Sequence, residues 1–257
     1  MAKVRALILR GPGTNCDAET AFAFQRAGAQ TSLVHINELI RGKARLSDYR
    51  LLIIPGGFTY GDDISAGKVL ANELRLRLRD TIDRFVADGG LIMGICNGFQ
   101  VLVKAGILPG PIKDAQADIT LASNDSGRFE CRWVHLVVNE DSPCVFTKGI
   151  KHMYLPSAHA EGKVIAGPEL IKSLNVVLRY TDKNSNLSAG YPYNPNGSID
   201  NIAGICDETG RIFALMPHPE RHIRKTQHPQ WMRQSPGTDY GDGFQIFVNA
   251  VNWARSI

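Results

Sequence analysis

Leu91-Ile-Met-Gly-Ile-Cys-Asn-Gly98 is an apolar run that ends in a cysteine, with one glycine two positions before it and another two positions after it. The pattern predicts a strand that turns sharply into a helix, with Cys96 at the bend. Such a bend exposes the side chain and places the positive end of a helix beside it. Both features favour the thiolate, which is the nucleophilic form of cysteine, so Cys96 is the first candidate catalytic residue.

The first half of the chain alternates short apolar segments with helical patterns. Strands are expected at residues 4–9, 31–36, 51–54 and up to Cys96. One helix is expected at 15–27, with Asn15 as its N-cap, and another from 97 onward. Between them, one long helix is expected to place Leu70, Leu74, Leu78, Ile82 and Phe85 on one face. This alternation is typical of a parallel sheet covered by helices on both faces, the α/β class. Ligand sites in such sheets lie at the carboxyl ends of the strands. Loops at Gly11, Gly56-Gly57 and Cys96 should therefore converge on one crevice.

The second half, from about residue 119, has shorter and more polar segments separated by turns such as Asn194-Pro-Asn-Gly197. Mostly antiparallel strands, added to the same sheet or flanking it, are expected at 131–138, 176–180 and 212–216, and a closing helix at 244–253. Residues 105–125 do not have the composition of a flexible linker. The whole chain, residues 1–257, is therefore predicted to be one domain.

Composition excludes several classes of function. The net charge of +4 over 257 residues is too small and too scattered to indicate nucleic-acid binding. The chain lacks both an apolar run long enough to span a membrane and a signal peptide at its start. Five widely spaced cysteines without a Cys-x-x-Cys pair indicate neither a disulfide framework nor a zinc ribbon, so a reducing cytoplasm is the expected setting. Complete nucleotide-binding glycine motifs are also missing from the sequence.

A cysteine nucleophile needs a base, and the base needs a group that orients it. Met216-Pro-His-Pro-Glu-Arg221 offers both after an apolar strand. In an extended segment, His218 and Glu220 project to the same side, so the carboxylate can brace the imidazole. The flanking prolines disfavour a helix, and with it a zinc-binding pair of His218 and His222. We therefore predict a Cys96–His218–Glu220 triad and no metal.

Other cysteines and histidines have plainer interpretations. A buried cysteine usually contributes packing alone, and that is the expectation for Cys16, Cys131, Cys144 and Cys206. His35 is expected to be structural, and His222 and His228 to lie in surface loops. His159, within Ser157-Ala-His-Ala-Glu-Gly162, remains an alternative base because it also has a carboxylate two residues further on.

The chain resembles the class I, or triad, glutamine amidotransferases over essentially its whole length, which implies a single-domain, flavodoxin-like α/β fold. Gly94-Ile-Cys-Asn-Gly-Phe-Gln100 and Met216-Pro-His-Pro-Glu-Arg221 carry this likeness. Within that superfamily it is most similar to the glutaminase subunits of phosphoribosylformylglycinamidine synthases. That narrower likeness rests on Pro55-Gly-Gly-Phe-Thr-Tyr-Gly-Asp62, Asn124-Asp-Ser-Gly-Arg-Phe-Glu130, Arg132-Trp133, Asn194-Pro-Asn-Gly-Ser198 and Ile202-Ala-Gly204.

The resemblance implies a role for each candidate. Cys96 would attack the side-chain amide of glutamine and form a γ-glutamyl thioester, His218 would transfer protons, and Glu220 would hold His218. The loops with Gly56 and Gly57 and with Asn97 and Gly98 would form the oxyanion hole, chiefly through the N–H groups of Gly57 and Asn97. Gln100 would help hold the substrate, and Asn124 and Phe129 would belong to the pocket wall.

The resemblance also implies partners. Ammonia would pass to a large synthetase subunit that uses ATP and magnesium to convert formylglycinamide ribonucleotide to formylglycinamidine ribonucleotide, with or without a small third subunit. This chain, which carries none of the synthetase, would act as a separate subunit without a cofactor of its own. Residues 222–243 resemble the larger, fused versions of the module and are a candidate contact with the partner.

Two alternatives remain at the level of sequence. The first is a stand-alone Cys-His-Glu hydrolase on the same fold, such as a peptidase or a γ-glutamyl hydrolase, which would be fully active without a partner. The second is a non-catalytic scaffold. Loss of a triad residue would favour the scaffold, but Cys96, His218 and Glu220 are all present.

Overall fold

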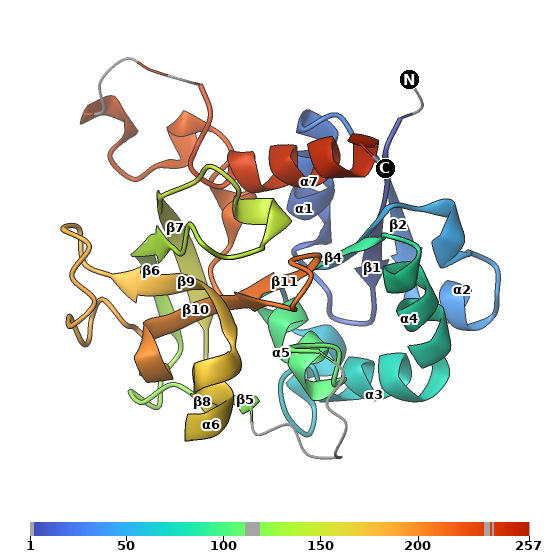
Figure 1. The fold of residues 1–257 in the computed structure, drawn as a ribbon, viewed down its shortest axis with the longest axis horizontal. Coiled ribbons are helices and arrows are strands. Elements are labelled where there is room, and N and C mark those ends of the chain that lie inside the picture. Colours follow the sequence, from blue (N-terminus) through green and yellow to red (C-terminus); the bar gives the residue numbers. More distant parts are fainter. Residues whose placement is uncertain (1–2, 111–118, 234–236, 238, 257) are drawn as a thin grey trace.

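The computed structural model describes residues 3–110, 119–233, 237 and 239–256. Its centre is a nine-stranded sheet with the strand order β2-β1-β3-β4-β11-β10-β9-β6-β7 (Figure 1). The strands are β1 (Arg5–Arg10), β2 (Gln30–His35), β3 (Leu51–Ile54), β4 (Leu91–Ile95), β6 (Glu130–Val138), β7 (His152–His159), β9 (Asn175–Thr181), β10 (Ile202–Cys206) and β11 (Ile212–Leu215). A separate pair joins β5 (Ile119–Ser123) to β8 (Glu161–Ala166) in antiparallel fashion.

The first five strands in this order are parallel, and the rest of the sheet is antiparallel. Strand β3 lies between β1 and β4, and β11 continues the parallel part beside β4. Every residue of β3 and β4 is buried, as expected of central strands covered on both faces. Strands β10, β9, β6 and β7 then extend the same sheet in antiparallel pairing. The predicted α/β architecture is confirmed, with one correction: the strand expected at 212–216 among the antiparallel strands is β11, which is parallel to β4 and antiparallel only to β10.

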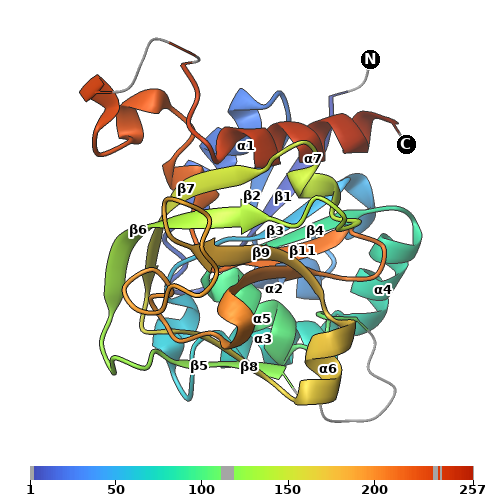
Figure 2. The same cartoon turned by 60° about the vertical axis from the view of Figure 1, so that its left-hand side comes forward.

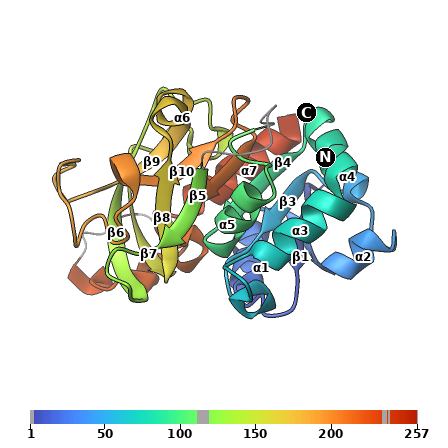
Figure 3. The ribbon, with the colours of Figure 1, turned by 90° about the horizontal axis from the view of Figure 1, so that it is seen from below.

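Helices cover the two faces of the parallel part. The helices are α1 (Asp17–Arg26), α2 (Ile36–Ile40), α3 (Lys68–Arg77), α4 (Arg79–Ala87), α5 (Asn97–Lys104), α6 (Pro168–Ser173) and α7 (Phe244–Ser256). Helices α1 and α7 lie together on one face, where the rings of Phe24 and Phe247 meet edge to face at 4.9 Å. Helices α3 and α5 lie on the other face, and the β5–β8 pair lies near α5 (Figure 3).

Three local predictions need correction. The long helix is two helices, α3 and α4, because the backbone leaves the helical conformation at Leu78 (φ −127°, ψ 5°), although all five predicted face residues are buried. Helix α1 is preceded by Cys16 rather than Asn15 as its N-cap residue, and no side chain caps it. His222 is 2% exposed, because its ring packs edge-on against Trp133 and its Nδ1 contacts the carbonyl oxygen of Tyr154 at 2.8 Å.

The described residues 224–233, between the last strand and α7, extend away from the sheet, as Figures 1 and 2 show. Within it, Arg224 and Tyr240 form an isolated antiparallel bridge, and Lys225–Gln227 and Trp231–Arg233 form short 3₁₀ turns. The expectations for residues 105–125 and 222–243 each include residues outside the described part of the chain, namely 111–118 in the first and 234–236 and 238 in the second. Across the part of the chain that is described, none of the helices combines the length and apolar character that crossing a membrane requires.

Candidate active site

Cys96 occupies the predicted bend between β4 and α5. Its backbone angles, φ 51° and ψ −103°, are rare for a residue other than glycine and store strain of about 1–3 kcal/mol. The strain is held on both sides: the Cys96 N–H donates to the carbonyl oxygen of Leu215 at 2.8 Å, and α5 starts at the next residue. Gly98 permits this turn, because a Cβ on it would overlap the carbonyl oxygen of Ile54.

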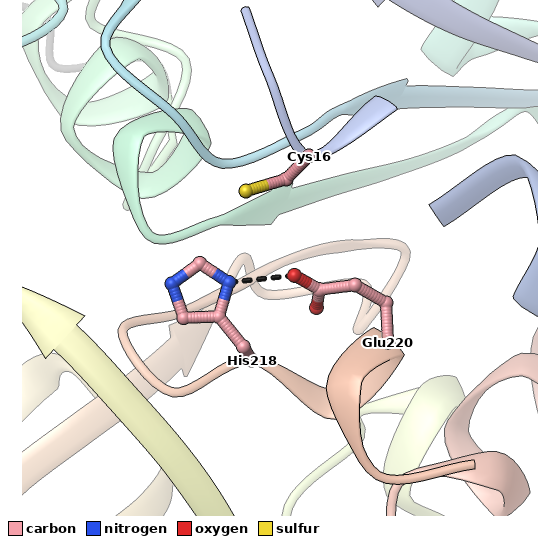
Figure 4. A group of neighbouring side chains, drawn as sticks. All are labelled: Cys16, His218 and Glu220. Carbon is pink, nitrogen blue, oxygen red and sulfur yellow. Dashed lines mark hydrogen bonds and ion pairs between the residues drawn. The ribbon is translucent and has the colours of Figure 1, made fainter. Parts of the chain in front are cut away.

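His218 and Glu220 are joined at the end of β11. Nδ1 of His218 lies 2.6 Å from Oε1 of Glu220, and both side chains are almost fully buried (Figure 4). The His218 N–H donates to the carbonyl oxygen of Pro156 at 2.7 Å, which fixes the residue against β7. The predicted brace is therefore present, but the expected extended backbone is wrong: Pro219–Arg221 form a 3₁₀ turn.

Charge near the imidazole favours its protonated form. Burial by itself would lower the pKa of His218, but the negative charges of Glu220 and Cys96 outweigh it and raise this pKa well above the usual range. The carboxylate at Nδ1 fixes a hydrogen there, so Nε2 is the nitrogen that can exchange a proton. Within the described residues, Nε2 is buried without a hydrogen-bond partner.

Cys96 and His218 line the same cavity, which has a volume of about 270 Å³. This lies just below the range of roughly 300–1,000 Å³ typical of sites for drug-sized ligands, so it suits a molecule as small as one amino acid. The cavity is lined by Asn15, Gly57, Phe58, Asp62, Ala66, Cys96, Gln100, Phe129, Cys131, Ala158, His159, Ala160, Glu161, His218 and Arg221. Three larger cavities, two of about 590 Å³ and one of about 320 Å³, have linings that do not bring a thiol and an imidazole together.

Two backbone N–H groups are available near the thiol. Asn97 is the first residue of α5, where an N–H has no acceptor within the helix. Gly57 lines the cavity and forms an isolated bridge with Thr14, and the hydrogen bonds of that bridge, from Phe58 to Gly13 and from Cys16 to Gly56, do not involve the Gly57 N–H. Their position is consistent with the predicted oxyanion hole.

The Asn97 side chain links two polar side chains of the cavity lining. Its Nδ2 donates to Oδ1 of Asp62 at 3.1 Å and to Oε1 of Gln100 at 2.9 Å. Nε2 of Gln100 donates in turn to the carbonyl oxygen of Glu161. The side chain of Gln100 is thus held at both ends, and it faces the cavity.

His159 also faces the cavity, but its surroundings are those of a neutral side chain. Both hydrogens on Nδ2 of Asn124 go to carbonyl oxygens, so Oδ1 of Asn124 accepts from Nδ1 of His159 at 3.0 Å. Burial, and then the charge of His218, lowers the pKa of His159 to about 4. The carboxylate of Glu161 does not brace the ring; it lies 3.7 Å from Nζ of Lys104. His159 therefore lacks the features of the alternative base.

The remaining predicted residues divide into two groups. Phe129 lines the cavity with about half its surface exposed, beside Phe58 at a centroid distance of 6.4 Å. Five predicted residues are absent from the cavity lining: Gly56, Asn97, Gly98, Asn124 and Glu220. Asn124, expected in the pocket wall, instead holds His159, which does line the cavity.

Sequence reasoning missed several residues of the site. Asp62 and Glu161 bring carboxylates to the cavity, and Arg221 brings a cation. Cys16, expected only to pack, lies beside His218 and Glu220 (Figure 4). Cys16 follows the Gly-Pro-Gly turn after β1, the same strand-end position that singled out Cys96, and this signal was available in the sequence.

Comparison with known proteins gives a consistent assignment. Residues 3–254 match the CobB/CobQ-like glutamine amidotransferase domain. The chain is 59% identical to phosphoribosylformylglycinamidine synthase subunit PurQ of Dehalococcoides mccartyi, over the full length of both proteins. It is 39% identical to the protein of the same name from Thermotoga maritima, with 98% of this chain and 99% of the relative covered.

Solved structures agree. A chain in the structure of PurLQS from Thermotoga maritima superposes with a TM-score of 0.72 at 35% identity, covering 98% of this chain and 99% of that one. Another glutamine amidotransferase from Thermotoga maritima, at 15% identity and a TM-score of 0.51, shares the fold over 90% of this chain and 82% of its own. The chain belongs to the family of glutamine amidotransferase subunits of phosphoribosylformylglycinamidine synthase.

Proposed function

We propose that this chain hydrolyses glutamine to glutamate and ammonia, and that the ammonia serves the synthesis of formylglycinamidine ribonucleotide in purine biosynthesis. The observation that carries the proposal is a single cavity that joins the Cys96 thiol to a His218 imidazole braced by Glu220. Full-length relatives named as PurQ subunits support the same reaction and disfavour both a stand-alone hydrolase and a scaffold.

In the first half of the reaction the proton of the Cys96 thiol already rests on Nε2 of His218, and the thiolate Sγ of Cys96 attacks the side-chain amide carbon of glutamine. The negative charge on the amide oxygen is taken up by the N–H groups of Gly57 and Asn97, each worth about 10²–10³ in rate. The tetrahedral intermediate collapses when His218 returns the proton to the amide nitrogen. Ammonia leaves, and a γ-glutamyl thioester remains on Cys96.

In the second half, His218 takes a proton from water, and the resulting hydroxide attacks the thioester carbon. Collapse of this second intermediate breaks the carbon–sulfur bond and releases glutamate, and the thiolate is restored. Glu220 keeps the imidazole in one orientation through both halves, because Nδ1 stays bonded to it.

Glutamine also carries an ammonium group that the cavity has to recognise. We propose that Asp62 supplies the opposite charge, since its carboxylate lines the cavity and is oriented by Asn97. Gln100, held by Asn97 and by the Glu161 carbonyl oxygen, would contribute polar contacts from the same side. Phe129 and Phe58 would cover the apolar part of the substrate.

We further propose that the chain works with a large synthetase subunit, with or without a small third subunit, as its relative in the PurLQS structure of Thermotoga maritima supports. ATP and magnesium would bind to the synthetase, and the complex would act in the cytoplasm, where a catalytic thiol stays reduced. Residues 222–243 remain a candidate contact with the partner; Trp231 and Met232 within them are 43% and 79% exposed.

Replacing the nucleophile in the assembled complex tests the proposal. Cys96→Ala should abolish synthesis from glutamine and leave synthesis from added ammonium intact, because the ammonium route bypasses the thiol. Cys206→Ala, a change at another buried cysteine outside the cavity, should keep both routes. Glutamine-dependent synthesis that survives in Cys96→Ala would refute the assignment, and full glutaminase activity without any partner would favour the stand-alone hydrolase.

A further inference from the structure

Cys16 lies beside the catalytic pair, in a layer that the proposed reaction does not use. Sγ of Cys16, a ring nitrogen of His218 and a carboxylate oxygen of Glu220 lie within 4.8 Å of one another (Figure 4). The Cys16 thiol is 1% exposed and does not belong to the cavity lining. Any part it plays in the reaction therefore runs through its neighbours.

A thiol, an imidazole and a carboxylate are ligands that zinc accepts, but two contacts argue against a cation here. Nδ1 of His218 already bonds Glu220, and Nη2 of Arg221 donates to Sγ of Cys16 at 2.9 Å. A cation would have to break the first contact and would then lie beside a permanent positive charge. The geometry points instead to a link from Arg221 to the catalytic pair.

Arg221 lies next to the buried carboxylate of Glu220. Its Nε lies 3.8 Å from Oε1 of Glu220, the oxygen that also holds His218. Glu220 is 1% exposed, and in the described part of the chain its Oε2 has no hydrogen-bond partner. An opposite charge beside a buried carboxylate offsets the cost of its burial, and the guanidinium adds such a charge to the one on His218.

Cys16 fixes the direction of that guanidinium. The Arg221 side chain is 37% exposed, and the carboxylate of Glu19, 3.9 Å from its Nε, is itself 36% exposed, so a buried hydrogen-bond partner is needed to hold the guanidinium in one place. The sulfur accepts an N–H of Arg221, and the thiol in turn lies 3.5 Å from Oδ1 of Asn15. Gly56 makes room for this arrangement: a Cβ there would lie 2.7 Å from Cε1 of His218 and 3.4 Å from Sγ of Cys16.

We propose that Cys16 and Arg221 are positioning residues for the triad. The contact between Sγ of Cys16 and Nη2 of Arg221 holds the guanidinium against Glu220, and this keeps the carboxylate aimed at Nδ1 of His218. The proposal rests on glutamine hydrolysis by Cys96, His218 and Glu220 as described above. It assigns Cys16 a function in catalysis without any contact with the substrate.

A double-mutant cycle in the full chain, assembled with its synthetase, tests this contact. Cys16→Ala and Arg221→Met should each lower kcat for glutamine hydrolysis about tenfold or more, the effect of losing one hydrogen bond to a charged group. The double variant should be no slower than the slower single variant, because both changes remove the same contact. KM should stay within about twofold in Cys16→Ala, and Arg221→Lys should recover part of kcat by restoring the charge.

Control variants separate an effect on the position of the triad side chains from an effect on the stability of the fold. Cys206→Ala and Arg79→Met change another buried cysteine and another ion-paired arginine, and both should keep wild-type kcat. The hydrogen bond to Glu220 should shift the NMR signal of the Nδ1 proton of His218 far downfield. In Cys16→Ala this downfield signal should lose intensity, even when the melting temperature is unchanged. If Cys16→Ala fails to fold, Cys16→Val carries the same test, because valine is similar in size to cysteine and cannot accept a hydrogen bond from Arg221.

Three results would overturn the proposal: wild-type kcat in the folded Cys16 variant, losses that multiply in the double variant, or a rise in KM alone in Arg221→Met, which would make Arg221 a substrate contact. Failure of the proposed function would look different, since Cys96→Ala would then keep its glutaminase activity. The two hypotheses are thus tested by separate variants.

Discussion

Oε1 of Glu220 lies 2.6 Å from Nδ1 of His218 and 3.8 Å from Nε of Arg221, so one carboxylate oxygen serves both the base and the cation behind it. Glu220→Gln should therefore lower kcat by about 10²-fold or more, because an amide can donate to Nδ1 and stabilise the wrong tautomer of the imidazole. Ammonia release under saturating glutamine measures the effect. Glu169→Gln, the same change at an exposed residue, is the control. Near-normal turnover in Glu220→Gln would contradict the brace.

Asp62 offers a test of substrate recognition. Asp62→Asn should raise KM for glutamine about tenfold with a smaller change in kcat, because it removes the charge that faces the ammonium group and keeps a side chain of similar shape. Asp63→Asn, at the exposed neighbouring residue, should leave KM unchanged. Initial rates over a range of glutamine concentrations separate the two constants. An unchanged KM in Asp62→Asn would place the ammonium group elsewhere.

The close contact at Gly98 predicts a large loss of stability. Gly98→Ala would push a methyl group into the carbonyl oxygen of Ile54, so α5 has to move away from β3. We expect the free energy of unfolding to fall by about 2 kcal/mol or more, as for other overpacked positions, measured by urea denaturation. Gly190→Ala is the control, because nothing lies within 4 Å of a Cβ there. Equal free energies of unfolding for wild type and Gly98→Ala would show that the turn between β4 and α5 tolerates a side chain at this position.

His159 predicts a specific pH dependence of stability. Its folded pKa of about 4 is below the ordinary 6.5, so as the pH falls through 6.5 the unfolded chain binds a proton that the folded chain refuses. The contribution of neutral His159 is complete above pH 6.5 and is lost on acidification towards pH 4, by roughly 3 kcal/mol in all.

The variant His159→Gln isolates this contribution from the other groups that titrate in the same range. The difference in unfolding free energy between wild type and His159→Gln should shrink as the pH is lowered from 7 to 4. The same difference for His152→Gln, at an exposed histidine, should change much less. A difference for His159→Gln that does not vary with pH would rule out a buried neutral imidazole.

Local sequence patterns predicted the framework of the site well. The apolar runs at β3 and β4, each bounded by glycine, specify strands without reference to the rest of the chain. The bend at Cys96 follows from the same local signal. The helical periodicity was also correct, but it continues across Leu78 and so gave no sign of the break between α3 and α4.

Local sequence patterns could not predict contacts between segments that are far apart in the chain. Cys16 meets Arg221, and Asp62 meets Asn97, only because separate strand-end loops converge. The burial of His222 depends on Trp133, which belongs to a strand on the antiparallel side of the sheet. Pairing of His218 with Glu220 was predicted on the assumption of an extended backbone, and the short side-chain distance tolerates the 3₁₀ turn that is present instead.

The position of β11 in the sheet determines when, during synthesis and folding of the chain, the catalytic pair can form. The chain leaves β4 at Ile95 and returns beside it only at Ile212, so β11 and His218, which follows it, are among the last parts to be synthesised. Contacts of such wide sequence separation form late in folding. A nascent or truncated chain that lacks β11 therefore holds a nucleophile without its base, and ammonia production begins only when β11 has been inserted between β4 and β10.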